Sequence, residues 1–219
     1  ALAVPVAAGL PFFGVRVLPA PLQKYFETSS GYPYATVNAF NWFAALGGNW
    51  APLADQAIGP FSWGTLGVVH IVLLTAALAV LAVVSWRADA RTGDRAHTGP
   101  RRFSPLLLAA FYTAGIFVLA HCMHERYLVL GVVLALLAAA RWGDIRLYGA
   151  AFGLSLTGFL NLAAVYTQAG TDDEWLSAAA SQTFVRAVGL ACTVAFVLLA
   201  LTTVTLCRGG RVSPLRRAE

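Results

Sequence analysis

The chain has 219 residues, of which 58% are hydrophobic and 11% are charged, and its mean hydropathy is +0.69. This composition excludes an ordinary soluble domain and predicts a polytopic membrane protein made of apolar helices. The net charge of +5 comes from arginines between and after the apolar runs, and does not indicate nucleic acid as a partner. The three cysteines lie within or at the ends of apolar runs, which is typical of small buried residues and not of a disulfide framework.

The chain does not begin with Met, and its first thirteen residues contain two prolines but no basic stretch, which argues against a signal peptide. We interpret the chain as the C-terminal part of a longer protein that begins inside a helix already in the bilayer. Residues 15–62 are mildly polar and contain several prolines, so we expect an external segment there. Within it, the pattern predicts a short interfacial helix over Ala35–Leu46, ended by two glycines.

Five further apolar runs predict helices that cross the membrane. In chain order the runs are Trp63–Trp86, Phe103–Met123, Tyr127–Ala140, Leu147–Tyr166 and Phe184–Cys207. With the partial span at the start, we expect an all-α transmembrane bundle of about six spans, forming a single membrane domain over residues 1–219. Residues 208–219 form a basic tail.

The basic residues are distributed unevenly between the two sides of this predicted topology. Eleven of the fifteen fall on one side: Arg87, Arg91, Arg95, Arg101, Arg102, Arg141, Arg146, Arg208, Arg211, Arg216 and Arg217. The positive-inside rule therefore predicts a multi-pass protein of the inner (plasma) membrane with a cytoplasmic C-terminus. The external segment and the turn around His124 then share the exoplasmic face, where we expect any chemistry to occur.

Ionisable side chains are concentrated in the turn between the second and third of these runs, where the sequence reads HCMHERY over His121–Tyr127. Charged groups at membrane depth cost roughly 2.5–3.5 kcal/mol each on insertion scales, so they are functional candidates. If the turn is helical, His121, His124 and Glu125 share one face. Arg126 carries a planar guanidinium that suits a phosphate group, and Tyr127 completes the candidate set.

Three interpretations of this turn are open at this point. It could bind a phosphate, or its charges could form a closed ion-pair network that only locks the hairpin. His121, Cys122, His124 and Glu125 are also ligand types for metals, but their spacing matches no known metal signature. We therefore expect no metal and no cofactor; a divalent ion is an alternative that the spacing does not indicate.

Amide and aromatic side chains are concentrated in a second stretch, residues 30–50. These groups suit sugar hydroxyls, through amide hydrogen bonds and ring stacking. The candidate residues for a sugar or acceptor cleft are Asn38, Asn41, Trp42 and Trp50, with Lys24 and Glu27 shortly before them. The alternative is a belt of aromatic residues that only anchors the protein at the membrane surface. His70 and Asn161 are lone polar residues within spans, and we expect each to hydrogen-bond to a neighbouring element.

The string MHERYL, residues 123–128, resembles a motif of bacterial GT-C-type membrane glycosyltransferases. The string TVNAFNWFAALGGNW, residues 36–50, is similar to an external stretch of the same proteins, and GFLNLAAVYT, residues 158–167, is a weaker likeness. The resemblance covers about Tyr32–Thr167. It implies a mannosyltransferase-like enzyme that takes its sugar from a polyprenyl-phosphate donor on the outer face. It also implies that His124, Glu125 and Arg126 hold the lipid phosphate, while the segment with Asn38 and Asn41 borders the donor or acceptor cavity.

The chain departs from this family in one respect, because nothing in it matches the first external loop that carries the catalytic Asp. The resemblance therefore implies that the base lies upstream of Ala1. The expected partners are membrane lipid, a polyprenyl-phosphate sugar, and the N-terminal part of the same protein or a separate subunit. An alternative function is a transporter or flippase-like protein for a polyprenyl-linked or anionic substrate, and a third is a structural membrane subunit.

Overall fold

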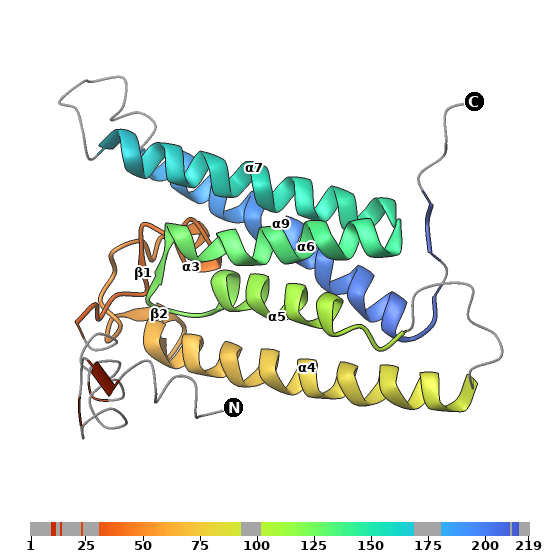
Figure 1. Ribbon diagram of the computed structural model, residues 1–219. Helices are drawn as coiled ribbons and strands as arrows, with labels where there is room; N and C mark the ends of the chain where they lie inside the picture. The colour runs from red at the N-terminus through yellow and green to blue at the C-terminus, as the bar shows by residue number, and fades with distance from the viewer. Residues whose placement is uncertain are drawn as a thin grey trace. The chain divides into compact units, whose positions relative to one another are not determined.

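The computed structural model describes residues 10–11, 14, 23, 31–92, 102–168, 181–210 and 212–214. The chain divides into two compact units, residues 1–33 and 34–219, and nearly all of the described residues belong to the second. The second unit is mostly helical (Figure 1).

The helices of the second unit are α3 (Trp42–Ala45), α4 (Trp63–Thr92), α5 (Pro105–Leu119), α6 (Leu128–Trp142), α7 (Ile145–Gln168) and α9 (Gln182–Cys207). A single 3-10 turn, Glu125–Tyr127, precedes α6. The strands are β1 (Thr36–Val37), β2 (Gln56–Ile58), β3 (Phe61–Ser62) and β4 (Met123–His124). They form two small sheets, the parallel pair β1–β4 and the antiparallel hairpin β2–β3.

Among the described residues, three helices, α4, α7 and α9, are long and apolar enough to cross a membrane. Helices α5 and α6 have 15 residues each, or about 22 Å at 1.5 Å per residue, which is shorter than a hydrocarbon core of about 30 Å. The prediction of about six spans is therefore not confirmed, and the expected partial span at the start of the chain lies almost entirely outside the described residues. The mostly helical character and the apolar helices are confirmed, but the two small sheets were not expected.

Local sequence signals determine where these helices begin and end. At the start of α5, Pro105 occupies the first turn, and the hydroxyl of Ser104 accepts a hydrogen bond from the backbone of Leu107 at 3.3 Å. Helix α6 ends at Gly143, whose φ of 64° is left-handed. Helix α9 ends in a Schellman motif, in which the N–H groups of Gly209 and Gly210 return to carbonyls of the last turn.

Helix α5 lies at the centre of the bundle and packs against α4, α6 and α9. Its contact with α6 is close, because a Cβ atom on Gly131 would lie only 3.1 Å from the backbone of Ala114. Phe111 of α5 stacks on Phe196 of α9, with ring centroids 5.9 Å apart. The largest buried cluster is formed by these helices and α7.

The outward faces of the long helices carry large apolar side chains. Examples with more than half of their surface exposed are Val72, Leu73 and Val80 on α4, Phe152 and Phe159 on α7, and Val194 and Leu201 on α9. An exterior of this kind is unfavourable in water and compatible with lipid.

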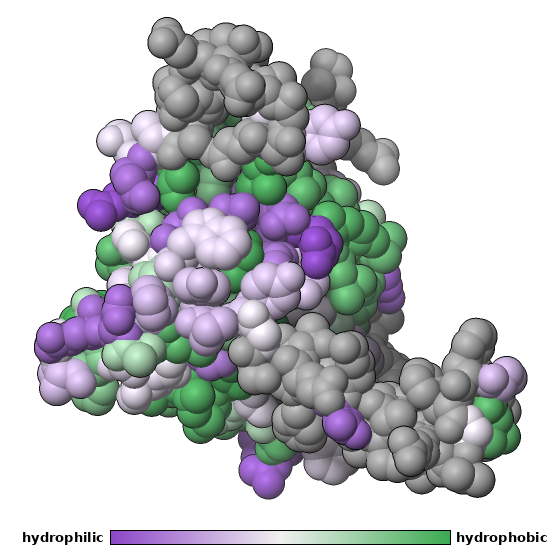
Figure 2. Space-filling view, turned by 90° about the vertical axis from the view of Figure 1, so that its left-hand side faces the viewer, coloured by the Kyte–Doolittle hydropathy of each residue, from purple (hydrophilic) through white to green (hydrophobic). Residues whose placement is uncertain are grey.

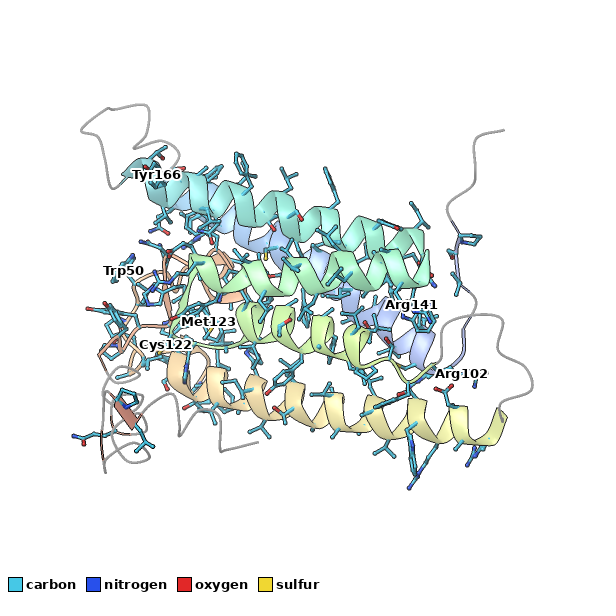
Figure 3. The ribbon with its side chains drawn as sticks, viewed as in Figure 1. Trp50, Arg102, Cys122, Met123, Arg141 and Tyr166 are labelled. Atoms are coloured by element: carbon cyan, nitrogen blue, oxygen red, sulfur yellow. The ribbon has the colours of Figure 1, made fainter. Side chains whose placement is uncertain are left out.

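The two ends of the bundle differ in character. Trp50, Cys122, Met123 and Tyr166 lie at one end, with β1, α3 and β2, whereas Arg102 and Arg141 lie at the other (Figure 3). The ends are called here the strand end and the arginine end. Which end faces the cytoplasm remains a prediction from the positive-inside rule.

Candidate functional site

The two stretches that the sequence singles out meet in the parallel pair β1–β4. Thr36 lies opposite Met123, and Val37 lies opposite His124. The Thr36 hydroxyl donates to the backbone carbonyls of Ala39 and Met123, at 2.9 and 3.2 Å. The part of the external segment from Tyr34 onward and the ionisable turn are therefore joined at the strand end.

Over His121–His124 the ionisable turn is not helical, and Glu125–Tyr127 form only a 3-10 turn, which corrects one expectation. Helix α5 ends at Leu119, and His124 has φ −107° and ψ 154°. Cys122 has a left-handed φ of 57°, and its N–H donates to the carbonyl of Ala35 at 3.1 Å. The prediction that His121, His124 and Glu125 share a helical face is wrong, because the backbone here pairs with the segment leading into β1.

The helix expected over Ala35–Leu46 is also wrong in extent, since only Trp42–Ala45 is helical. Asn38 has a left-handed φ of 57°, which a helix does not allow. Asn41 is the N-cap, and its side-chain oxygen accepts from the backbone of Phe43 and Ala44 at 3.1 and 3.3 Å. The two asparagines therefore do not lie one helical turn apart.

Asn41 and Asn161 are buried and connect elements inside the protein. Asn41 is 0% exposed, and its Nδ2 donates to the carbonyl of Phe117 on α5 at 2.8 Å. Asn161 of α7 accepts from the N–H of Phe40 at 3.0 Å and donates to the carbonyl of Asn38 at 2.7 Å. Asn161 thus links the resembling string over residues 158–167 to the one over residues 36–50. In this conformation the amide of Asn41 is used by the protein, so a ligand has no access to it.

Five residues around the strand pair are connected in a series, in which each contacts the next through its side chain or its backbone. We call Trp50, Asn38, His124, Tyr127 and Arg126 the outer cluster. The indole N–H of Trp50 donates to Asn38 Oδ1 at 2.7 Å, and the backbones of Asn38 and His124 form an isolated β-bridge. The His124 ring lies edge-on to Tyr127 at 5.5 Å, and the Arg126 guanidinium carbon lies 5.6 Å from the Tyr127 ring centroid.

The outer cluster includes an accessible cation. The Arg126 side chain is 63% exposed, while that of Glu125 is 15% exposed. Their closest nitrogen–oxygen distance is 3.7 Å, which is an ion pair but too long for a hydrogen bond. The guanidinium can therefore donate to another anion. Figure 2 views the strand end, where hydrophilic residues (purple to white) occupy the middle of the surface and hydrophobic residues (green) lie beside them.

The protonation of His124 is shifted by its surroundings. Partial burial lowers the pKa of His124, the nearby Arg126 lowers it further, and Glu125 opposes the shift. A neutral imidazole at pH 7 can donate one hydrogen bond and accept one. The positive charge of the outer cluster at neutral pH therefore resides on Arg126.

The remaining predicted residues lie in different surroundings. The His121 ring packs on α4, where a Cβ atom on Gly67 would be 2.7 Å from its Cγ. Trp42 is partly buried and packs against two core clusters. Lys24 and Glu27 lie outside the described residues. The described cleft residues therefore differ in accessibility. Asn38 and Trp50 meet in an exposed hydrogen bond, whereas Asn41 is buried and Trp42 is partly buried.

Sequence reasoning missed two residues that shape the outer cluster. Tyr34 lies edge-on to Trp50, with ring centroids 5.3 Å apart, and the side-chain oxygen of Asn49 accepts from the backbone of Asn38 at 3.0 Å. Asn49 lies next to Trp50 in the sequence, so a search for Asn-Trp pairs could have found it. Within the described ranges no group of three His, Cys, Asp or Glu side chains is placed to hold a metal.

Comparisons with family models, with curated proteins and with solved structures found no match to this chain. The likeness to GT-C glycosyltransferases therefore depends on the strings quoted above. The geometry adds that all three strings meet at the strand end.

Proposed function

We propose that this chain is the donor-lipid part of a membrane glycosyltransferase that takes a sugar from a polyprenyl-phosphate carrier on the outer face of the membrane. The observation that carries the proposal is the parallel pairing of Thr36–Val37 with Met123–His124. It brings the Asn- and Trp-bearing stretch next to the turn that carries the exposed guanidinium of Arg126. A polyprenyl-phosphate sugar combines these two kinds of group, a saccharide and an anionic phosphate.

The chemistry of such a transfer gives the outer cluster a defined role. The acceptor hydroxyl attacks the anomeric carbon, the bond from that carbon to the phosphate oxygen breaks, and the polyprenyl phosphate leaves with increased negative charge. A guanidinium positioned at that oxygen stabilises the charge as it develops. The base that removes the hydroxyl proton is expected upstream of Ala1.

The aromatic and amide groups have a complementary role in the proposal. Trp50 is 45% exposed, and an indole face of this kind can stack on a sugar ring. Its N–H is held by Asn38, so the ring orientation is restrained before a ligand binds. We expect this restraint to reduce the entropy lost on binding.

The test uses the purified chain in detergent with two probes, undecaprenyl phosphate and the uncharged alcohol undecaprenol. We expect the phosphate to bind better than the alcohol, and Arg126→Ala to remove most of this preference, at least tenfold, because a hydrogen bond to a charged group contributes about 1.5–3 kcal/mol. Arg186→Ala is the matched control. It removes an exposed arginine whose guanidinium packs on Gly47 and which is not one of the five residues of the outer cluster.

Equal binding of the two lipids, or an equal loss in both variants, would contradict the proposal. Sugar transfer is then measured with the complete protein and a labelled polyprenyl-phosphate mannose. Movement of the intact lipid across a reconstituted membrane, without transfer of its sugar, would instead support the transporter alternative.

A further inference from the structure

The arginine end of the bundle contains a hollow of about 610 Å³ that is lined by four arginines. The lining residues are Val84, Arg87, Ala88, Arg91, Arg102 and Arg208. They come from the end of α4, from the approach to α5 and from the C-cap of α9, which lie together at this end of the bundle (Figure 1). We propose that this hollow binds the phosphate-bearing headgroup of an anionic phospholipid.

Four guanidinium groups line the hollow, and α4 contributes one acid near them, Asp89. In the part of the chain that the structure describes, none of the four guanidinium groups forms an ion pair with a carboxylate. Asp89 is the nearest acid on α4, and its two oxygens accept from the backbone N–H groups of Arg102 and Phe103 at 3.0 and 2.9 Å. Asp89 therefore ties down the backbone that carries Arg102.

The structure holds one of these arginines at a defined position. A Cβ atom on Gly209 would lie 2.6 Å from the guanidinium carbon of Arg102, so the guanidinium lies directly on the Gly209 backbone. Gly209 has a left-handed φ of 83° and belongs to the Schellman motif that ends α9. Arg102 is thereby held on the residue that follows Arg208, and both arginines line the hollow. Planar guanidinium forks suit the several oxygens of a phosphate.

The position of the hollow favours a lipid over a soluble anion. It lies at the end of α4, a helix long and apolar enough to cross a membrane. Val80, Val83 and Trp86, just before Arg87, are exposed apolar side chains, and Val84 lines the hollow itself. A phosphate bound here would leave acyl chains against this apolar surface. Basic pockets between membrane helices commonly hold anionic headgroups in this way.

The experiment uses the full chain reconstituted in phosphatidylcholine vesicles, with spin-labelled phosphatidylglycerol and spin-labelled phosphatidylcholine as probes. Electron paramagnetic resonance measures the motionally restricted fraction of each probe. We expect the phosphatidylglycerol to be preferred. We expect each of the single variants Arg91→Gln and Arg208→Gln to reduce this preference about fivefold. Arg141→Gln is the control, because it removes an exposed arginine at the same end that does not line the hollow.

Two measurements on the unaltered chain keep the proposal testable if a variant folds poorly. Raising sodium chloride is expected to weaken the phosphatidylglycerol preference, since it screens an electrostatic contact. Inorganic phosphate at millimolar concentration is expected not to displace the lipid. Displacement by inorganic phosphate would overturn the proposal in favour of a free-anion site. No preference between the two lipids, or an equal effect of Arg141→Gln, would also overturn it.

Discussion

Asn161 and Asn38 lie 123 residues apart in the sequence and are joined by a hydrogen bond of 2.7 Å from Asn161 Nδ2 to the Asn38 carbonyl. The same amide accepts from the N–H of Phe40 at 3.0 Å. A single side chain of α7 thus satisfies two backbone groups of the external segment. Because Asn38 also bridges to His124, this amide supports the position of the outer cluster.

We predict that Asn161→Leu destabilises the protein by about 3 kcal/mol, since it leaves two backbone groups without their partner. Chemical unfolding in detergent micelles, followed by tryptophan fluorescence, measures the change. Thr203→Val is the control, because Thr203 is also fully buried but its hydroxyl donates to Leu199 of its own helix. Equal, small losses in both variants would mean that the link between α7 and the external segment contributes little.

Arg126→Ala is predicted to change the free energy of unfolding by less than about 0.5 kcal/mol, because exposed ion pairs contribute little. The Arg126 side chain is 63% exposed and its pair with Glu125 is long. Under the proposed function the same variant loses undecaprenyl phosphate binding. Parallel unfolding and binding measurements separate the two effects, and a large loss of stability would indicate that Arg126 locks the turn and does not serve a ligand.

Two tryptophans of the external segment are predicted to differ in their contribution to stability. Trp42 packs against two buried clusters, and Trp42→Ala is expected to cost about 3 kcal/mol. Trp50 is 45% exposed, and Trp50→Ala is expected to cost less than about 1.5 kcal/mol, mainly for its hydrogen bond to Asn38. Unfolding midpoints of the two variants in the same detergent check the order. The reverse order would assign Trp50 to the core.

Asp144 is predicted to make stability depend on acid pH. Burial alone would raise the pKa of its carboxyl, but hydrogen bonds from the Arg146 side chain and from the Ser213 and Arg146 backbones outweigh burial and hold the pKa below its ordinary value. The folded state thus binds the proton less readily than the unfolded state. The resulting stability is present above the ordinary aspartate pKa of about 3.9 and is lost as the pH falls through the lower folded value.

Asp144→Asn tests this prediction. We expect the variant to lose about 2 kcal/mol at pH 7, where the buried carboxylate is paired with Arg146 at 2.7 Å. We also expect its stability to fall less steeply than that of the unaltered chain below pH 4. Unfolding curves from pH 3 to pH 7 provide the comparison. Parallel pH profiles for the two proteins would show that Asp144 does not carry this dependence.

The sequence by itself determined the class of the protein and the position of its long helices. Apolar composition and uninterrupted runs predict helices that suit a membrane, and α4, α7 and α9 follow those runs closely. The ends of α5, α6 and α9 carry their own signals in Ser104, Gly143 and Gly209, because capping depends on residues within one turn. The ionisable turn could also be singled out as a candidate site from the sequence, because charged residues are rare between apolar runs.

Only the tertiary structure decided the conformation of the site. Strands of two residues, such as β1 and β4, have no alternating pattern to detect, and their pairing joins residues far apart in the sequence. Residues 121–124 of the turn are not helical because their backbone pairs with the external segment, and no local sequence pattern predicts this pairing. Which asparagines are buried and which side chains remain exposed follows from that pairing. Helix ends depend on residues within one turn, whereas the partner of a paired backbone segment depends on the tertiary structure of the whole chain.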